Sequence, residues 1–87
     1  MQEILPGIFH WMTFHHGIEQ DVHSYHIAVL DPPVLIDPRV PAEGLGWFKA
    51  HKPPLHIYLT NRHHYRQSGR FEDYYGTKVW CHKDGLH

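Results

Sequence analysis

The residues best suited to chemistry cluster in one stretch, residues 55–69, with the sequence LHIYLTNRHHYRQSG. An apolar, β-prone run at residues 57–60 ends there in a group of Asn, Arg and His side chains. Side chains just beyond a strand end can converge on one point without filling the core, and α/β proteins often bind ligands there. Imidazoles bind metal ions, and arginines bind carboxylate or phosphate through a bidentate fork. The stretch therefore predicts a polar site at the end of a strand.

The polar members of this stretch allow more than one interpretation. Asn61, Arg62 and Arg66 could together form an anion-binding pocket, or the two arginines could lie on the solvated face of a loop. His63 is the candidate metal ligand, although a single His can equally be a hydrogen-bonding residue. His64 adds no second ligand in extended backbone, because adjacent side chains point to opposite sides.

Composition limits the classes of protein to which the chain can belong. Its 87 residues suffice for one small domain, and 41% hydrophobic residues favour a folded chain over a disordered one. A formal charge of −1 without a basic stripe predicts no nucleic-acid or membrane-surface partner. Cys81 is the single cysteine, so no intrachain disulfide can form, and we expect a buried thiol. Because no segment resembles a leader or a spanning helix, we predict a cytoplasmic protein.

Histidine is the unusual component, with 11 of the 87 residues. Protonation of all 11 would raise the formal charge from −1 to +10, so mild acid should strain the folded chain. The histidines are scattered rather than spaced as ligand sets, which favours surface positions for most of them. The alternative is an atypical metal site, with zinc as its ion, built from His63 and other histidines that folding or dimerisation brings together.

Alternating and apolar runs define the elements that must position the site. They predict strands over residues 4–12, 22–30, 34–37, 55–60 and 77–82. Pro6-Gly7 interrupts the first strand, and residues 13–21 are predicted as a polar connection. Asp31-Pro32-Pro33 predicts the turn of a hairpin. The near-continuous apolarity of residues 55–60 predicts an interior parallel strand that is buried on both faces.

Two helices are expected between these strands. The first is predicted over residues 42–51, with Leu45, Trp47 and Phe48 facing inward, although Gly44 and Gly46 weaken it. The second is predicted to start at a Ser68 cap, to end at Tyr75 before a Gly76 C-cap, and to turn Phe71 and Tyr74 inward. The element order predicts an α/β fold, with a mixed β-sheet and flanking helices.

The order of four motifs resembles the N-terminal half of the metallo-β-lactamase fold. The motifs are Leu5-Pro6-Gly7-Ile8 in the opening strand, Ser24-Tyr25 in the second, Leu35-Ile36-Asp37-Pro38 at the end of the third, and Leu59-Thr60 before the site loop. The strand with Val79-Trp80-Cys81-His82 also lies where the family has its next strand. The resemblance implies that residues 1–87 are a single partial domain, equal to half of an αββα sandwich.

The family's signature after Leu-Thr is His-x-His-x-Asp-His, which binds one or two metal ions, usually zinc. In the same frame this chain has Asn61, Tyr65 and Arg66, and His63 alone keeps a ligand position. Asn is a weak ligand, and Arg66 would place a permanent cation where the family binds one. The resemblance therefore implies a degenerate metal site and no catalytic residue. Asp37 resembles the family aspartate that supports the metal loop. The alternative, which we favour, is a structural role as a strand-end turn residue that accepts backbone N–H groups.

The resemblance leads to a functional expectation with two alternatives. We expect a metallo-hydrolase-like protein with a degenerate site that is inactive as this chain, because most ligands are replaced and the family's C-terminal half is absent. The first alternative is a homodimeric binding module, since half of a sandwich would expose one sheet face. The second alternative is the histidine-based metal binder. Fold does not identify the small-molecule substrate.

Overall fold

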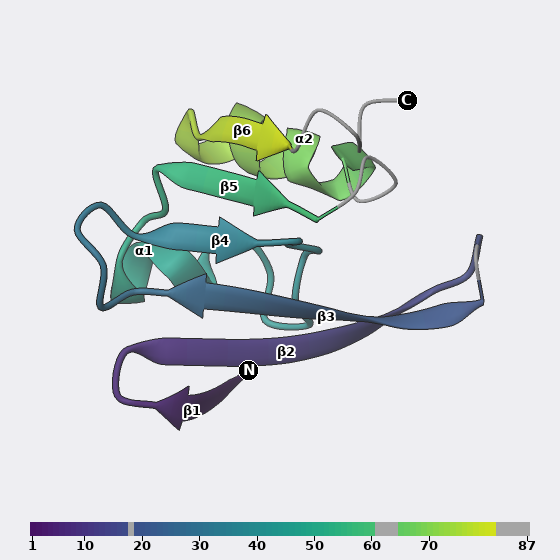
Figure 1. Cartoon of the computed structure of the whole chain (residues 1–87), viewed down its shortest axis with the longest axis horizontal. Helices are drawn as coiled ribbons and strands as arrows, with labels where there is room; N and C mark the ends of the chain where they lie inside the picture. The colour runs from purple at the N-terminus through teal and green to yellow at the C-terminus, as the bar shows by residue number, and fades with distance from the viewer. Residues whose placement is uncertain (18, 61–64, 82–87) are drawn as a thin grey trace.

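The chain folds around one six-stranded mixed sheet with two helices (Figure 1). The computed structural model describes residues 1–17, 19–60 and 65–81, excluding the side chains of Tyr65 and Arg66. The elements in chain order are β1 (Gln2–Leu5), β2 (Ile8–His15), β3 (Gln20–Ile27), β4 (Val34–Ile36), α1 (Trp47–His51), β5 (His56–Leu59), α2 (Tyr65–Tyr75) and β6 (Lys78–Cys81). The strands lie in the sheet in sequence order, so the predicted α/β class with a mixed sheet is confirmed.

The first part of the sheet is antiparallel. The single strand predicted over residues 4–12 is wrong, because Pro6 and Gly7 form a turn that separates β1 from β2. Gly7 has a φ of +77°, and a Cβ there would lie 2.9 Å from Cβ of Val29, so this turn requires glycine. The predicted polar connection is also shorter than expected, because β2 continues to His15 and β3 begins at Gln20. The two strands pair throughout as a long antiparallel ribbon.

The second part of the sheet is parallel. The predicted hairpin at Asp31-Pro32-Pro33 is confirmed, since β3 and β4 are antiparallel. Strands β4, β5 and β6 then run parallel, with α1 and α2 in the two crossovers. The predicted interior position of β5 is confirmed, whereas its burial on both faces is not. Ile57 and Leu59 are buried, but Tyr58 points to the other face and is 47% exposed.

Both helices differ from their predicted bounds. Helix α1 begins at Trp47 rather than residue 42, because Gly44 has a φ of +84°, which is incompatible with a right-handed helix. Helix α2 begins at Tyr65, so Ser68 lies inside the helix, fully buried, and is not its N-cap. The predicted C-cap is confirmed, because Gly76 has a φ of +70° and its N–H donates to the Glu72 carbonyl at 2.8 Å.

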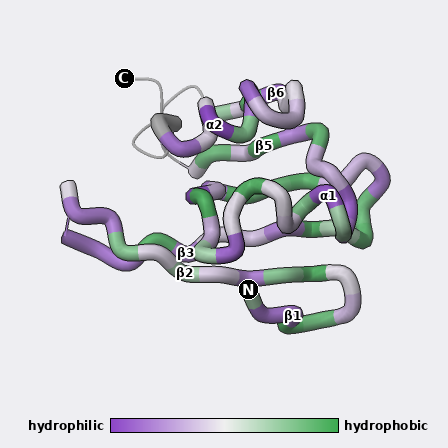
Figure 2. The backbone as a smooth tube through the Cα atoms, turned by 180° about the vertical axis from the view of Figure 1, so that it is seen from behind, coloured by the Kyte–Doolittle hydropathy of each residue, from purple (hydrophilic) through white to green (hydrophobic). Residues whose placement is uncertain are grey.

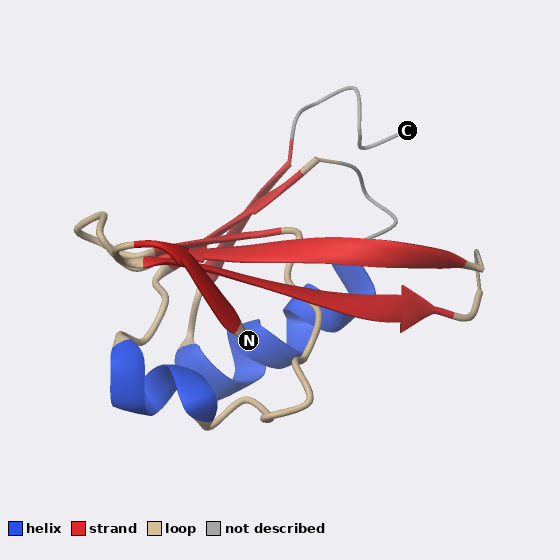
Figure 3. Cartoon of the chain, turned by 90° about the horizontal axis from the view of Figure 1, so that it is seen from below, coloured by secondary structure: helices blue, strands red, loops and turns tan. Residues whose placement is uncertain are grey.

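The core lies between the sheet and the two helices, which occupy the same side of the sheet (Figures 2 and 3). It consists of Trp11, Leu35, Phe48, Ile57, Leu59 and Phe71. The predicted inward positions of Phe48 and Phe71 are confirmed, and Leu45 and Trp47 pack at the edge of the core. Tyr74 is 44% exposed, contrary to prediction, and Tyr75 packs against the core in its place. Cys81 is a free thiol and is half-buried rather than fully buried.

No described element covers the other side of the sheet, which we call the open face (Figure 3). Within the described ranges, no helix is long and apolar enough to cross a membrane.

Candidate functional site

The candidate site lies where the carboxyl ends of β4 and β5 meet. The sequence ends β4 at Ile36, and the next residue, Asp37, turns the chain with a φ of +45°. Asp is among the few non-glycine residues that adopt this left-handed conformation, because its short side chain can bond to nearby backbone. The Asp37 N–H donates to the Tyr58 carbonyl at 3.0 Å, so the turn is attached to β5. This arrangement places an acidic side chain at the edge where parallel-sheet proteins often hold ligands.

The Asp37 carboxylate binds Thr60, the first residue after β5. Its Oδ1 accepts the Thr60 N–H at 2.7 Å, and its Oδ2 accepts the Thr60 hydroxyl at 2.6 Å. Asp37 is 6% exposed, so these charge-assisted bonds stabilise a buried carboxylate. The two residues therefore form a clamp, Asp37–Thr60, that fixes the backbone at the start of the site loop.

Ser24 supports the same turn from β3. Its hydroxyl donates to the Asp37 carbonyl at 2.7 Å and accepts the Arg39 N–H at 3.2 Å. Ser24 is fully buried on the helix-covered face, so a residue with this hydroxyl is needed to satisfy both backbone groups. Helix α2 supplies the next support, because Oε1 of Gln67 accepts the Val40 N–H at 3.0 Å.

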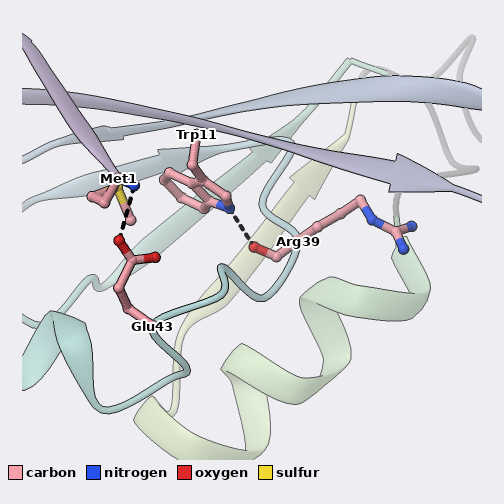
Figure 4. Close-up of polar contacts among 4 residues, drawn as sticks. All are labelled: Met1, Trp11, Arg39 and Glu43. Atoms are coloured by element: carbon pink, nitrogen blue, oxygen red, sulfur yellow. Dashed lines mark hydrogen bonds and ion pairs between the residues drawn. The ribbon is translucent and has the colours of Figure 1, made fainter.

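The segment after Asp37 is also attached to β2 and to the first residue of the chain (Figure 4). Trp11 Nε1 donates to the Arg39 carbonyl at 2.7 Å, and the Arg39 side chain extends away from this bond (Figure 4). The Met1 amino group lies 2.9 Å from Oε2 of Glu43 and, mainly by this hydrogen bond, lowers the pKa of the Glu43 carboxyl. The segment from Asp37 to Glu43, after β4, is thus held by backbone and side-chain bonds along its length.

The predicted site residues fall into two groups. Asp37 is described, and its predicted structural role in a strand-end turn is observed. Asn61 and His63 lie outside the described residues, and for Arg66 only the backbone within α2 is described. Sequence reasoning missed the roles of Ser24 and Gln67. A serine at an inward position of β3, between Val22 and His26, was a usable signal, whereas nothing in the sequence points to Gln67.

Among the described residues at these strand ends, no complete set of zinc ligands is present. Asp37 already uses both carboxylate oxygens on Thr60. Across the described ranges, no group of three or more His, Cys, Asp or Glu residues is arranged to hold a metal ion.

Neither a scan against protein-family models nor a search of curated proteins finds a match for this chain.

Proposed function

We propose that this chain is a metallo-β-lactamase-like domain that keeps the scaffold of a metallo-hydrolase without its metal-dependent chemistry. The observation that carries the proposal is the Asp37–Thr60 clamp, which holds the start of the site loop although three of four signature positions are Asn61, Tyr65 and Arg66. A clamp of this kind fixes Thr60, the residue that precedes the loop after β5, whether or not that loop binds a metal ion. The strand ends then serve as a polar surface rather than as a source of metal-bound hydroxide.

The proposal can be tested directly by changing the replaced positions back to the ligand residues of the signature. The triple variant Asn61→His/Tyr65→Asp/Arg66→His supplies, with His63, the ligand types of a zinc site. We expect it to bind one more equivalent of zinc than the native chain, measured by elemental analysis after gel filtration. The native chain should hydrolyse no β-lactam, thioester or phosphodiester. Chelator-sensitive hydrolysis of any of these by the native chain would contradict the proposal.

A second candidate function, assembly with a second copy, is favoured by the open face. Following the strand register, His10, Tyr25, Ile36, Tyr58 and Trp80 form one row across five strands. A parallel row contains Ile8, Ile27, Val34, His56 and Lys78. Tyr58 and Trp80 are 47% and 48% exposed, so large apolar side chains lie on this face where it is formed by β5 and the edge strand β6. Lys78 alone in these rows carries a formal charge, so two copies can face each other with little like-charge repulsion.

The assembly candidate predicts a change in mass on substitution. Tyr58→Glu/Trp80→Glu places two buried carboxylates in such an interface and should convert a dimer to a monomer, as measured by light scattering. The matched control is Leu30→Glu/Leu55→Glu, which alters two equally exposed apolar residues outside the two rows and should leave the dimer intact. A native chain that is monomeric at high concentration and binds no apolar dye would exclude assembly through this face.

A further inference from the structure

His10 on β2 and His23 on β3 form a cross-strand pair on the open face. Nε2 of His10 lies 2.9 Å from Nδ1 of His23, and the ring planes are within 15° of each other. The ring centroids are 5.1 Å apart, so the two rings lie edge to edge, with one nitrogen donating and the other accepting. In the register, His10 faces Tyr25 and Met12 faces His23, which makes the histidines diagonal neighbours. Two imidazole nitrogens therefore lie next to each other on an exposed surface, each directed at the other.

We propose that His10 and His23 form a chelating site for a divalent transition-metal ion of the Cu²⁺ or Ni²⁺ class. Imidazole nitrogens bind such ions at about 2.0–2.1 Å. If the rings turn toward a shared ion while the nitrogens stay 2.9 Å apart, an ion at that distance from both subtends an angle of about 90°. That angle matches neighbouring positions of square-planar or octahedral coordination, whereas tetrahedral zinc needs a wider one. Water fills the remaining positions on the ion.

The ribbon that carries the pair favours chelation. Strands β2 and β3 are paired from Ile8–Ile27 to His15–Gln20, which fixes the two backbones relative to each other. When one imidazole binds the ion, the second is therefore already at a high effective concentration. The His23 side chain is exposed, so its ring can turn from the present hydrogen bond toward a shared ion. For both nitrogens to bind the ion, the hydrogen bond breaks, the donating imidazole carries its proton on its other ring nitrogen, and two metal–nitrogen bonds form.

The test compares two variants that each remove two histidines. His10→Asn/His23→Asn removes the pair, and His15→Asn/His16→Asn removes two neighbouring histidines on the same ribbon and leaves the pair in place. Each protein is titrated with Cu²⁺ at pH 7.5 by calorimetry, and the bound ion is examined by electron paramagnetic resonance for two nitrogen ligands. Circular dichroism reports whether each variant folds, and the single variant His23→Gln, at an exposed position, serves if the first double variant does not.

We expect one Cu²⁺ to bind the native chain and the His15→Asn/His16→Asn control with two nitrogen ligands. Loss of either member of the pair should weaken binding about 100-fold, because chelation is lost. Affinity should also fall on acidification, because each imidazole must be deprotonated to bind. Equal losses in the two double variants, or native-like binding by His10→Asn/His23→Asn, would overturn the proposal. This test is independent of the zinc test of the proposed function. The triple variant used there keeps both His10 and His23, so either proposal can fail without the other.

Discussion

Lowering the pH from 7 to 4 is expected to reduce the free energy of unfolding by roughly 3 kcal/mol through His26 alone. His26 is fully buried on the helix-covered face, where its ring contacts Phe48 and Trp47 edge-on and stacks on Phe9. Neither ring nitrogen makes a hydrogen bond of normal geometry with a described residue. Burial, reinforced by the nearby His51, lowers the pKa of His26 from 6.5 to about 4, and the backbone of Lys52 offsets part of the shift.

The direction of the effect follows from which state binds the proton first. Because the folded-state pKa of His26 lies below its unfolded value, the unfolded chain gains the proton first as the pH falls. Stability is therefore unaffected by this group above about pH 6.5, and the loss accumulates between about pH 6.5 and pH 4. The other histidines also titrate in the unfolded chain, so the contribution of His26 must be measured as a difference between proteins.

The variant His26→Leu isolates this contribution. Leucine has a similar volume and no ionisable group, so we expect stability at pH 7 within about 1.5 kcal/mol of the native chain. Denaturant unfolding at pH 7 and pH 4 should give a pH-dependent loss that is roughly 3 kcal/mol smaller in the variant. His16→Asn, at an exposed position, is the control and should lose as much stability as the native chain. Equal losses in His26→Leu and the native chain would show that His26 is not held neutral.

Local patterns were sufficient to predict the pairing of β3 with β4 and the parallel strand β5. The Asp31-Pro32-Pro33 hairpin and the parallel β5 could be predicted because turn chemistry and apolar runs are local signals. The hairpin between β1 and β2 at Pro6-Gly7 was not predicted. Its turn is held by the Gly7 carbonyl, which accepts the N–H groups of Ala28 and Val29 just after β3. Bonds of that kind join distant residues and leave no periodic signal.

In the candidate site, too, local sequence signals could be predicted and contacts between distant residues could not. Asp37 could be identified from its place after an apolar strand, and its role as a turn residue follows from its chemistry. Gln67 could not be identified, because its bond to Val40 exists only when the first turns of α2 pack beside the loop after β4. The late start expected for α2 also hid this contact, since Gln67 was placed outside the helix. The bond from Val40 to Gln67 depends on how α2 packs against the loop after β4, so the local sequence around either residue does not predict it.

The Asp37–Thr60 clamp leads to the second large prediction, that Asp37→Ala destabilises the chain by at least about 4 kcal/mol. The substitution removes two hydrogen bonds to a charged group, worth about 1.5–3 kcal/mol each, and places alanine at a φ of +45° at a cost of about 1–2 kcal/mol. These losses approach the whole stability of a small domain, about 5–15 kcal/mol. Denaturant unfolding at pH 7 measures the difference.

Two further substitutions separate the contributions to this loss. Asp37→Gly relieves the backbone strain and still removes both bonds, so we expect it to recover about 1–2 kcal/mol relative to Asp37→Ala. Asp37→Asn tolerates the left-handed backbone and can accept the Thr60 N–H while its amide donates to the Thr60 hydroxyl, so it should lose only about 1 kcal/mol. Hydrogen exchange at the Thr60 amide should be fast in the Ala and Gly variants and slow in the Asn variant. If Asp37→Ala were no less stable than Asp37→Asn, the side-chain hydrogen bonds to Thr60 would be dispensable. Ser24 and Gln67 would then have to position Thr60 through the segment after β4 that they bind.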